Sequence, residues 1–60
     1  MTTAQEKSYK TYTGVGYEYD WTDADGVIVL CRWSHTGEAR WKTGQIRINL
    51  DGIVRAVCDA

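Results

Sequence analysis

The residue types most suited to binding a metal in this 60-residue chain are Cys31, His35 and Cys58. Thiolates and imidazoles are the usual zinc ligands, but zinc sites built from them carry closely paired spacings such as Cys-x-x-Cys. Here a fourth ligand would have to be an acid such as Asp59. We therefore predict no metal and no cofactor, and interpret both cysteines as reduced, packed thiols, with an inter-strand disulfide as the alternative for an exported protein.

His35 is also the one candidate for acid-base catalysis, with Glu38, Arg40 and Arg32 as neighbours that could complete a site. It precedes Thr36-Gly37, a turn-like sequence that is open to water. A chain this short has limited means of building a pocket that excludes water. We predict that the protein is not an enzyme.

The acids of Asp23-Ala24-Asp25-Gly26 resemble the middle of a calcium loop, but the surrounding positions do not fit. An EF-hand in that frame needs an acid where Trp21 stands and a bidentate glutamate where Arg32 stands. Asp also favours the start of turns and the position before Gly. We interpret the segment as a turn.

With metal binding and catalysis set aside, the composition favours binding to another macromolecule. The chain holds four tyrosines and three tryptophans, together with basic side chains from Arg32 onward. Trp, Tyr and Arg dominate the energetics of protein interfaces. The same residue types stack on bases and contact phosphates, which makes binding of single-stranded RNA or DNA the alternative. Residues 17–26 hold four acids and no base, so that end of the chain would repel phosphates.

We therefore predict a non-enzymatic protein-binding module that acts stoichiometrically. Compact binders of this size are often regulators or inhibitors of a larger protein machine, including those encoded by phages; this is an association with size alone. The predicted contact surface consists of Arg32, Trp33, Arg40, Trp41 and Arg47. A second candidate surface consists of the acids Glu18, Asp20, Asp23 and Asp25.

The elements that must position these side chains are short strands, and the clearest signal is a β-hairpin from Val15 to Trp33. Every second residue of its first half is apolar or aromatic, which predicts one aromatic face made of Val15, Tyr17, Tyr19 and Trp21. The Asp23–Gly26 turn reverses the chain, since Gly accepts a positive φ. The strand that follows, Val27–Ser34, is apolar on both faces. Its second face, with Ile28 and Leu30, therefore needs a cover, either a barrel closure or another subunit.

The chain before the hairpin is predicted to hold a short N-terminal segment and one edge strand. Thr3 and Glu6 fit a capping box, but the segment is too short to hold a helix alone, so residues 1–7 are expected to form a tail or one helical turn. Weak alternation predicts an edge strand at Ser8–Thr13, and the Gly14 and Gly16 pair predicts a bend after it.

The apolar pattern in the second half of the chain predicts two more strands, Trp41–Leu50 and Ile53–Cys58. The apolar phase of the first changes at Gly44, which indicates a bulge. A two-residue turn at Asp51-Gly52 would set Leu50 beside Ile53. A three-residue loop with Gly52 in the left-handed region gives the cleaner apolar face and is favoured; its pairs would be Ile48 with Val54, Ile46 with Ala56, and Arg47 with Arg55.

The predicted fold is thus all-β: residues 1–60 as a single small domain, an antiparallel meander of about four to five short strands forming a curled sheet or small barrel. A chain of this size buries only about 60% of its unfolded surface, which favours a homodimer or a partner. The net charge of −1 gives no field that would drive the molecule onto a membrane. The absence of a long apolar run or signal-like N-terminus predicts a cytoplasmic protein.

Overall fold

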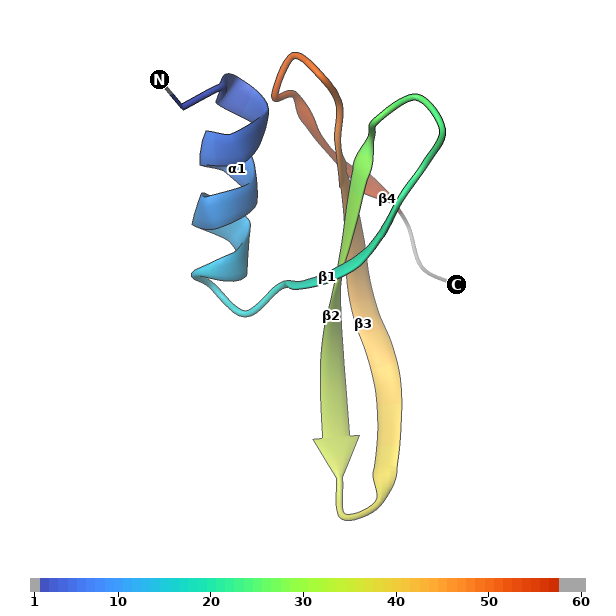
Figure 1. Cartoon of the computed structure of the whole chain (residues 1–60). Coiled ribbons are helices and arrows are strands. Elements are labelled where there is room, and N and C mark those ends of the chain that lie inside the picture. Colours follow the sequence, from blue (N-terminus) through green and yellow to red (C-terminus); the bar gives the residue numbers. More distant parts are fainter. Residues whose placement is uncertain (1, 58–60) are drawn as a thin grey trace.

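The protein is an open four-stranded sheet with one helix on one face, described for residues 2–57 in a computed structural model (Figure 1). Its elements in chain order are α1 (Ala4–Thr13), β1 (Glu18–Thr22), β2 (Ile28–Thr36), β3 (Ala39–Ile48) and β4 (Val54–Val57). The strands lie in the order β1-β2-β3-β4 and every pair is antiparallel. The predicted meander of short strands is confirmed, and the sheet does not close into a barrel.

Helix α1 overturns two predictions. From Ala4 onward the segment expected to be a tail or one helical turn belongs to a ten-residue helix, and the strand predicted at Ser8–Thr13 does not form. The Thr3 side chain caps the helix by accepting a hydrogen bond from the Glu6 N–H at 3.1 Å. A ten-residue helix is marginal in isolation, so its stability comes from packing. Tyr9 and Tyr12, three positions apart, both pack against the sheet core.

Polar contacts fix α1 to the two turns at one end of the sheet. The Gln5 amide nitrogen donates to the Gly26 carbonyl at 2.7 Å, and the Ser8 hydroxyl donates to the Gly52 carbonyl at 3.0 Å. Gly52 has a φ of 81°, and a Cβ there would lie 2.7 Å from the Cβ of Ala4. Glycine is therefore required at this position both for the turn and for the approach of the helix.

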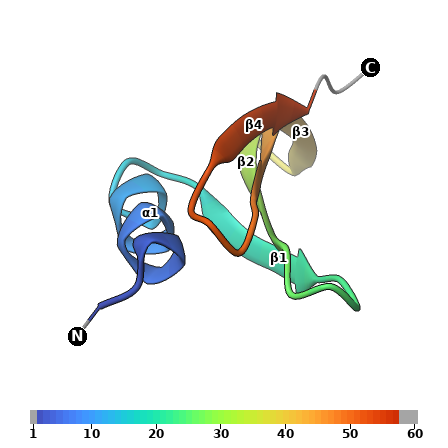
Figure 2. The same ribbon diagram turned by 90° about the horizontal axis from the view of Figure 1, so that it is seen from above.

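The core lies between α1 and the sheet. Leu30, Ile46 and Ile48 are its buried centre, and five partly buried side chains surround them: Tyr9, Tyr12, Tyr17, Ile28 and Val54. We call this side of the sheet the helix face (Figure 2). The prediction that the Ile28 and Leu30 side of β2 needs a cover was right. The predicted cover, a barrel closure or another subunit, was wrong, because helix α1 packs on this side.

The predicted first hairpin is confirmed, with a correction at β1. The turn closes as expected, with Gly26 N–H donating to the Asp23 carbonyl at 3.0 Å. The β1–β2 register shifts between Tyr19 and Trp21, so that Tyr19 pairs with Leu30 and Trp21 with Val29. Neighbouring residues of β2 point to opposite faces. The predicted single aromatic face of β1 is therefore wrong: Tyr19 lies on the helix face and Trp21 on the opposite one.

The predicted irregularity near Gly44 and the favoured register of the last hairpin are both confirmed. Gly44 pairs with Arg32 and Lys42 with Trp33, which leaves Thr43 as the extra residue of a bulge. Ile48 pairs with Val54, and Gly52 adopts the left-handed region. The final residue of the predicted last strand, Cys58, lies outside the described residues.

Candidate functional site

The far half of the β2–β3 hairpin projects beyond the rest of the molecule (Figure 1). β1 pairs with β2 only as far as Cys31, and the described part of β4 pairs with β3 from Gln45 onward. Within residues 2–57, Arg32–Thr36 and Ala39–Gly44 therefore pair only with each other. We call residues 32–44 the arm; they help to give the molecule its long dimension of 41 Å. A two-stranded ribbon is marginal in water unless side chains brace it.

Trp33 braces the arm on the face opposite the helix. The Arg40 guanidinium carbon lies 4.4 Å from the centroid of the Trp33 ring, and the Lys42 Nζ lies 5.5 Å from it. Cations over an indole are attracted by its negative face, each contributing about 0.5–1 kcal/mol at exposed sites. Trp33 is thus partly covered by side chains of its own hairpin.

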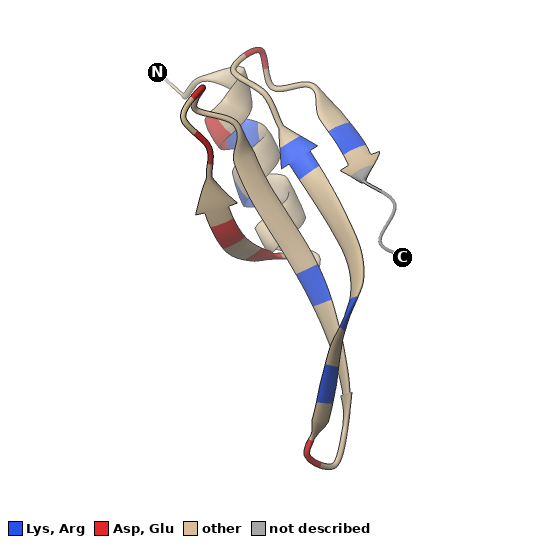
Figure 3. Cartoon of the chain, turned by 90° about the vertical axis from the view of Figure 1, so that its right-hand side faces the viewer, with Lys and Arg blue, Asp and Glu red and all other residues tan. Residues whose placement is uncertain are grey.

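Three ion pairs connect the acids of β1 and its turn with the bases of β3: Glu18–Arg40 at 3.0 Å, Asp20–Lys42 at 3.1 Å and Asp23–Arg47 at 2.8 Å. β2 lies between β1 and β3, so all three pairs span it. We call this side of the sheet the ion-pair face; Figure 3 shows acids along β1 opposite bases on β3. Val29 and Cys31 also lie on this face, and both are buried.

The predicted basic and acidic surfaces are therefore largely one surface. Arg40 and Arg47, assigned to the first, pair with Glu18 and Asp23, assigned to the second. The charges separated along the sequence are brought together and neutralised by the fold. Asp25 alone of the four acids stays outside the ion pairs; it is exposed in the turn, and its N–H donates to the Asp23 carboxylate.

Asp23 holds the β1–β2 turn together at the edge of this face. Its Oδ1 accepts the N–H groups of Asp25 and Val27, and its Oδ2 accepts from Arg47. The hydrogen bond from Val27 N–H, with those from Asp25 and the charge of Arg47, lowers the pKa of Asp23 below its ordinary value of 3.8. Arg47 and Arg55 lie opposite each other on β3 and β4, as predicted. The Asp23 carboxylate bound to Arg47 reduces the repulsion between the two arginines.

Arg32 lies at the base of the arm on the helix face, where it contacts the segment that precedes β1. Its Nη2 donates to the Val15 carbonyl at 2.8 Å, and its guanidinium carbon lies 4.5 Å from the centroid of the Tyr17 ring. The hydroxyl oxygen of Tyr17 in turn lies 3.6 Å from where a Cβ on Gly44 would stand. Arg32 thus fixes the segment that leads into β1 against the hairpin.

Trp41 is the aromatic side chain of the arm that remains presented to solvent. It pairs with Ser34, which places it on the face opposite Trp33. It is 46% exposed, and no ring or cation contact to it is found among the described residues. The helix, which covers the same side of the sheet, lies over the body and not over the arm (Figures 1 and 2).

The structure thus brings four of the five predicted contact residues onto the arm and leaves Arg47 on the body. The predicted protein-contact surface left out Lys42, which lies over the Trp33 ring together with Arg40. Its signal was present, because residues 40 and 42 lie on one side of a strand with Trp41 between them.

Among the described residues, no three His, Cys, Asp or Glu side chains gather as a metal site, and no helix has the length and apolar character needed to cross a bilayer. The chain matches no protein-family model, no curated protein and no solved structure.

Proposed function

We propose that the protein is a non-enzymatic binding module that inserts its arm into a larger protein partner, with Trp41 as the central contact. The observation that carries this proposal is the exposure of Trp41 on a ribbon that adds nothing to the core. Tryptophan is the residue most enriched among interface side chains whose truncation costs most binding energy. A regulator or inhibitor of a cytoplasmic protein machine, of the kind phages encode, fits this mode; the buried free thiol of Cys31 suits a reducing compartment.

The arm supports protein binding better than binding of RNA or DNA. Phosphate binding needs cations free to replace counterions. Arg40 and Lys42 each contact a carboxylate and the Trp33 ring, and Arg32 contacts a carbonyl and the Tyr17 ring. Those contacts would have to be shared or given up before a phosphate could bind.

The test is capture of the partner from the native host with the wild-type chain and with Trp41→Ala, followed by titration of each identified partner. Trp41→Ala should weaken binding by about 2 kcal/mol, or roughly thirtyfold, while the domain still folds. Leu50→Ser is the matched control, since Leu50 is an exposed apolar residue of the body. It should bind like the wild type.

Unchanged affinity of Trp41→Ala, with intact folding, would remove the arm from the proposal. A labelled oligonucleotide at low salt provides the second readout. Binding that falls steeply as salt rises, and that weakens with Lys42→Gln, would favour the nucleic-acid alternative. The homodimer stays a prediction, and native mass spectrometry showing only monomer at micromolar concentration would count against it.

A further inference from the structure

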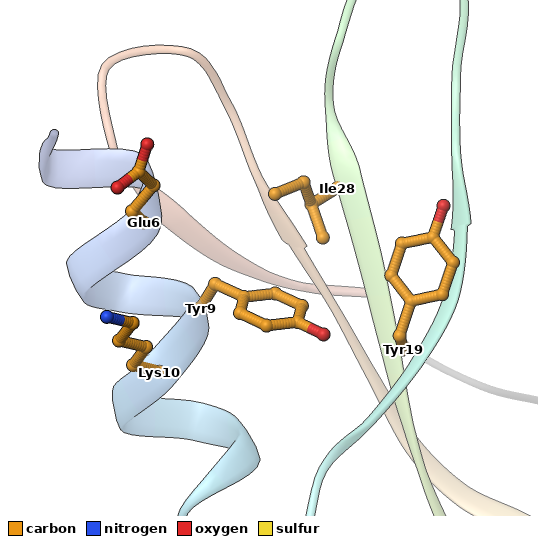
Figure 4. A pocket seen from close by; sticks show the side chains of 5 residues that line it. All are labelled: Glu6, Tyr9, Lys10, Tyr19 and Ile28. Carbon is orange, nitrogen blue, oxygen red and sulfur yellow. The ribbon is translucent and has the colours of Figure 1, made fainter. Parts of the chain in front are cut away.

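A groove separates the helix from the edge strand β1 on the body of the molecule. Its volume is about 410 Å³, and it is lined by Glu6, Tyr9, Lys10, Tyr19 and Ile28 (Figure 4). The Tyr9 and Tyr19 rings meet edge to face with their centroids 6.5 Å apart, and Ile28 lies between the helix and β1. The walls are thus mainly apolar, and the volume falls within the range of about 300–1,000 Å³ typical of binding pockets.

The edge of β1 beside this groove is unpaired within residues 2–57, because β1 is the first strand of the sheet. An unpaired edge presents N–H and C=O groups that a further extended segment can bond. Such a segment would place every second side chain on the helix face, where Tyr19 lies. Those side chains of the added segment would enter the groove between α1 and β1.

The opposite face of the same edge carries four acids, three of which pair with bases of β3. Glu18 and Asp20 on β1 are followed by Asp23 and Asp25 in the turn, and residues 17–26 contain no base. Arg40 and Lys42 reach Glu18 and Asp20 across β2, and each ion pair uses one carboxylate oxygen. A carboxylate can accept further hydrogen bonds at its other oxygen. Basic side chains of an added segment would meet these acids from the outer side.

We propose that the β1 edge binds an extended segment of a partner protein in which apolar and basic residues alternate. The apolar residues enter the groove between α1 and β1, and the basic residues face the acids of β1 and its turn. Strand addition of this kind takes affinity from backbone hydrogen bonds and selectivity from the pocket and the charges. The surface lies on the body and does not include Trp41, although Arg40 and Lys42 of the arm pair with two of its acids.

A second copy of the chain is a poor occupant of this edge. Two β1 strands paired about a two-fold axis would bring Glu18 and Asp20 of one copy beside the same acids of the other. Like charges on adjacent strands are destabilising. The charge pattern therefore favours a basic segment from a different protein.

The experiment titrates the intact protein with a nine-residue peptide in which valine and lysine alternate around a central tryptophan. Binding is followed by calorimetry and by NMR shifts of the β1 amides. The matched control replaces every lysine with glutamate and should bind at least tenfold more weakly. Two N-methylated peptides, each blocking one alternate set of amides, separate strand addition from simple charge attraction. One set faces β1 and its methylation should abolish binding, whereas the other should leave binding intact.

Protein variants locate the site. Tyr19→Ala should weaken the peptide at least tenfold, Tyr19→Phe should retain it, and Trp41→Ala should leave it unchanged, which separates this site from the arm. Equal binding of the lysine and glutamate peptides, equal behaviour of the two N-methylated peptides, or indifference to Tyr19→Ala would each overturn the proposal. Self-association that Tyr19→Ala abolishes would also overturn it, in favour of a second copy.

Discussion

The body and the arm differ in what covers them. In the body, a helix lies on the sheet and encloses Leu30, Ile46 and Ile48. In the arm, no other described residues form a second layer over the two strands. Trp33 lies under two cations, whereas Trp41 is exposed. The buried core and the exposed Trp41 thus lie in separate parts of this chain, even though β2 and β3 run through both.

The largest effect on stability should follow from opening the core of the body. Leu30 is fully buried, and Leu30→Ala removes its packing and leaves a cavity. We expect the free energy of unfolding to fall by about 2–5 kcal/mol, enough to unfold much of a domain this small. Urea denaturation followed by circular dichroism measures this. A loss under about 1 kcal/mol would mean that the helix-on-sheet layer is not the source of stability.

Two glycines with a positive φ allow the same substitution to be compared in the two regions. Gly52 in the body has a φ of 81° and contacts the helix, whereas Gly37 at the tip of the arm has a φ of 59° and open space around it. Alanine costs about 1–2 kcal/mol at either position for its left-handed backbone. Gly52→Ala must also displace the N-terminus of α1, so its melting temperature should fall further than that of Gly37→Ala. Equal losses would contradict the close approach of Ala4 to Gly52.

Alanine substitution of the two tryptophans of the arm should also have different effects on stability. Trp33→Ala removes the ring beneath Arg40 and Lys42, and should cost about 1 kcal/mol of stability. Trp41→Ala should change stability by no more than about 0.5 kcal/mol, as expected for an exposed side chain without specific contacts. Chemical denaturation of both variants checks this. Equal destabilisation would show that Trp41 also supports the fold.

The smallest effect concerns pH and the turn at Asp23. Because the folded protein lowers the pKa of Asp23, the ionised carboxylate contributes stability above about pH 4, and that contribution is lost as the pH falls through the lowered pKa. Asp23→Asn should therefore show less acid destabilisation than the wild type between pH 5 and pH 2. Salt should reduce the part that comes from Arg47. Parallel acid profiles of the two proteins would contradict this role.

The sequence predicted the strands well because their signals are local. The Asp-Gly turns, the alternation of Ile46 and Ile48, and the phase change at Gly44 each determine structure within a few residues. The favoured pairing of Ile48 with Val54 followed from placing apolar residues on one face.

Helix α1 could not be predicted in this way because its support is distant in the sequence. Tyr9, Thr11 and Thr13 alternate like a strand, and tyrosine and threonine favour strands. The contacts that decide for a helix are the bonds from Gln5 and Ser8 to carbonyls 21 and 44 residues away. Tertiary contacts thus override the local preference.

Four of the five predicted contact residues lie on one hairpin, but they are divided between the two faces of the sheet. Arg32, Trp33, Arg40 and Trp41 do share the arm. The two charged surfaces merge because β1 lies beside β2 and β2 beside β3, a pairing that composition does not reveal. The bulge in β1 moved Trp21 to the other face, since one extra residue reverses the alternation.

Amide hydrogen exchange of the protein, alone and with its captured partner, tests whether the arm is the binding surface. In the free protein, amides of the core strands at Leu30 and Ile48 should exchange slowly, and those of the arm at residues 39–43 much faster. With the partner bound, the arm amides should become protected while the core amides change little. Protection that leaves residues 39–43 unchanged would contradict the assignment of the arm as the binding surface.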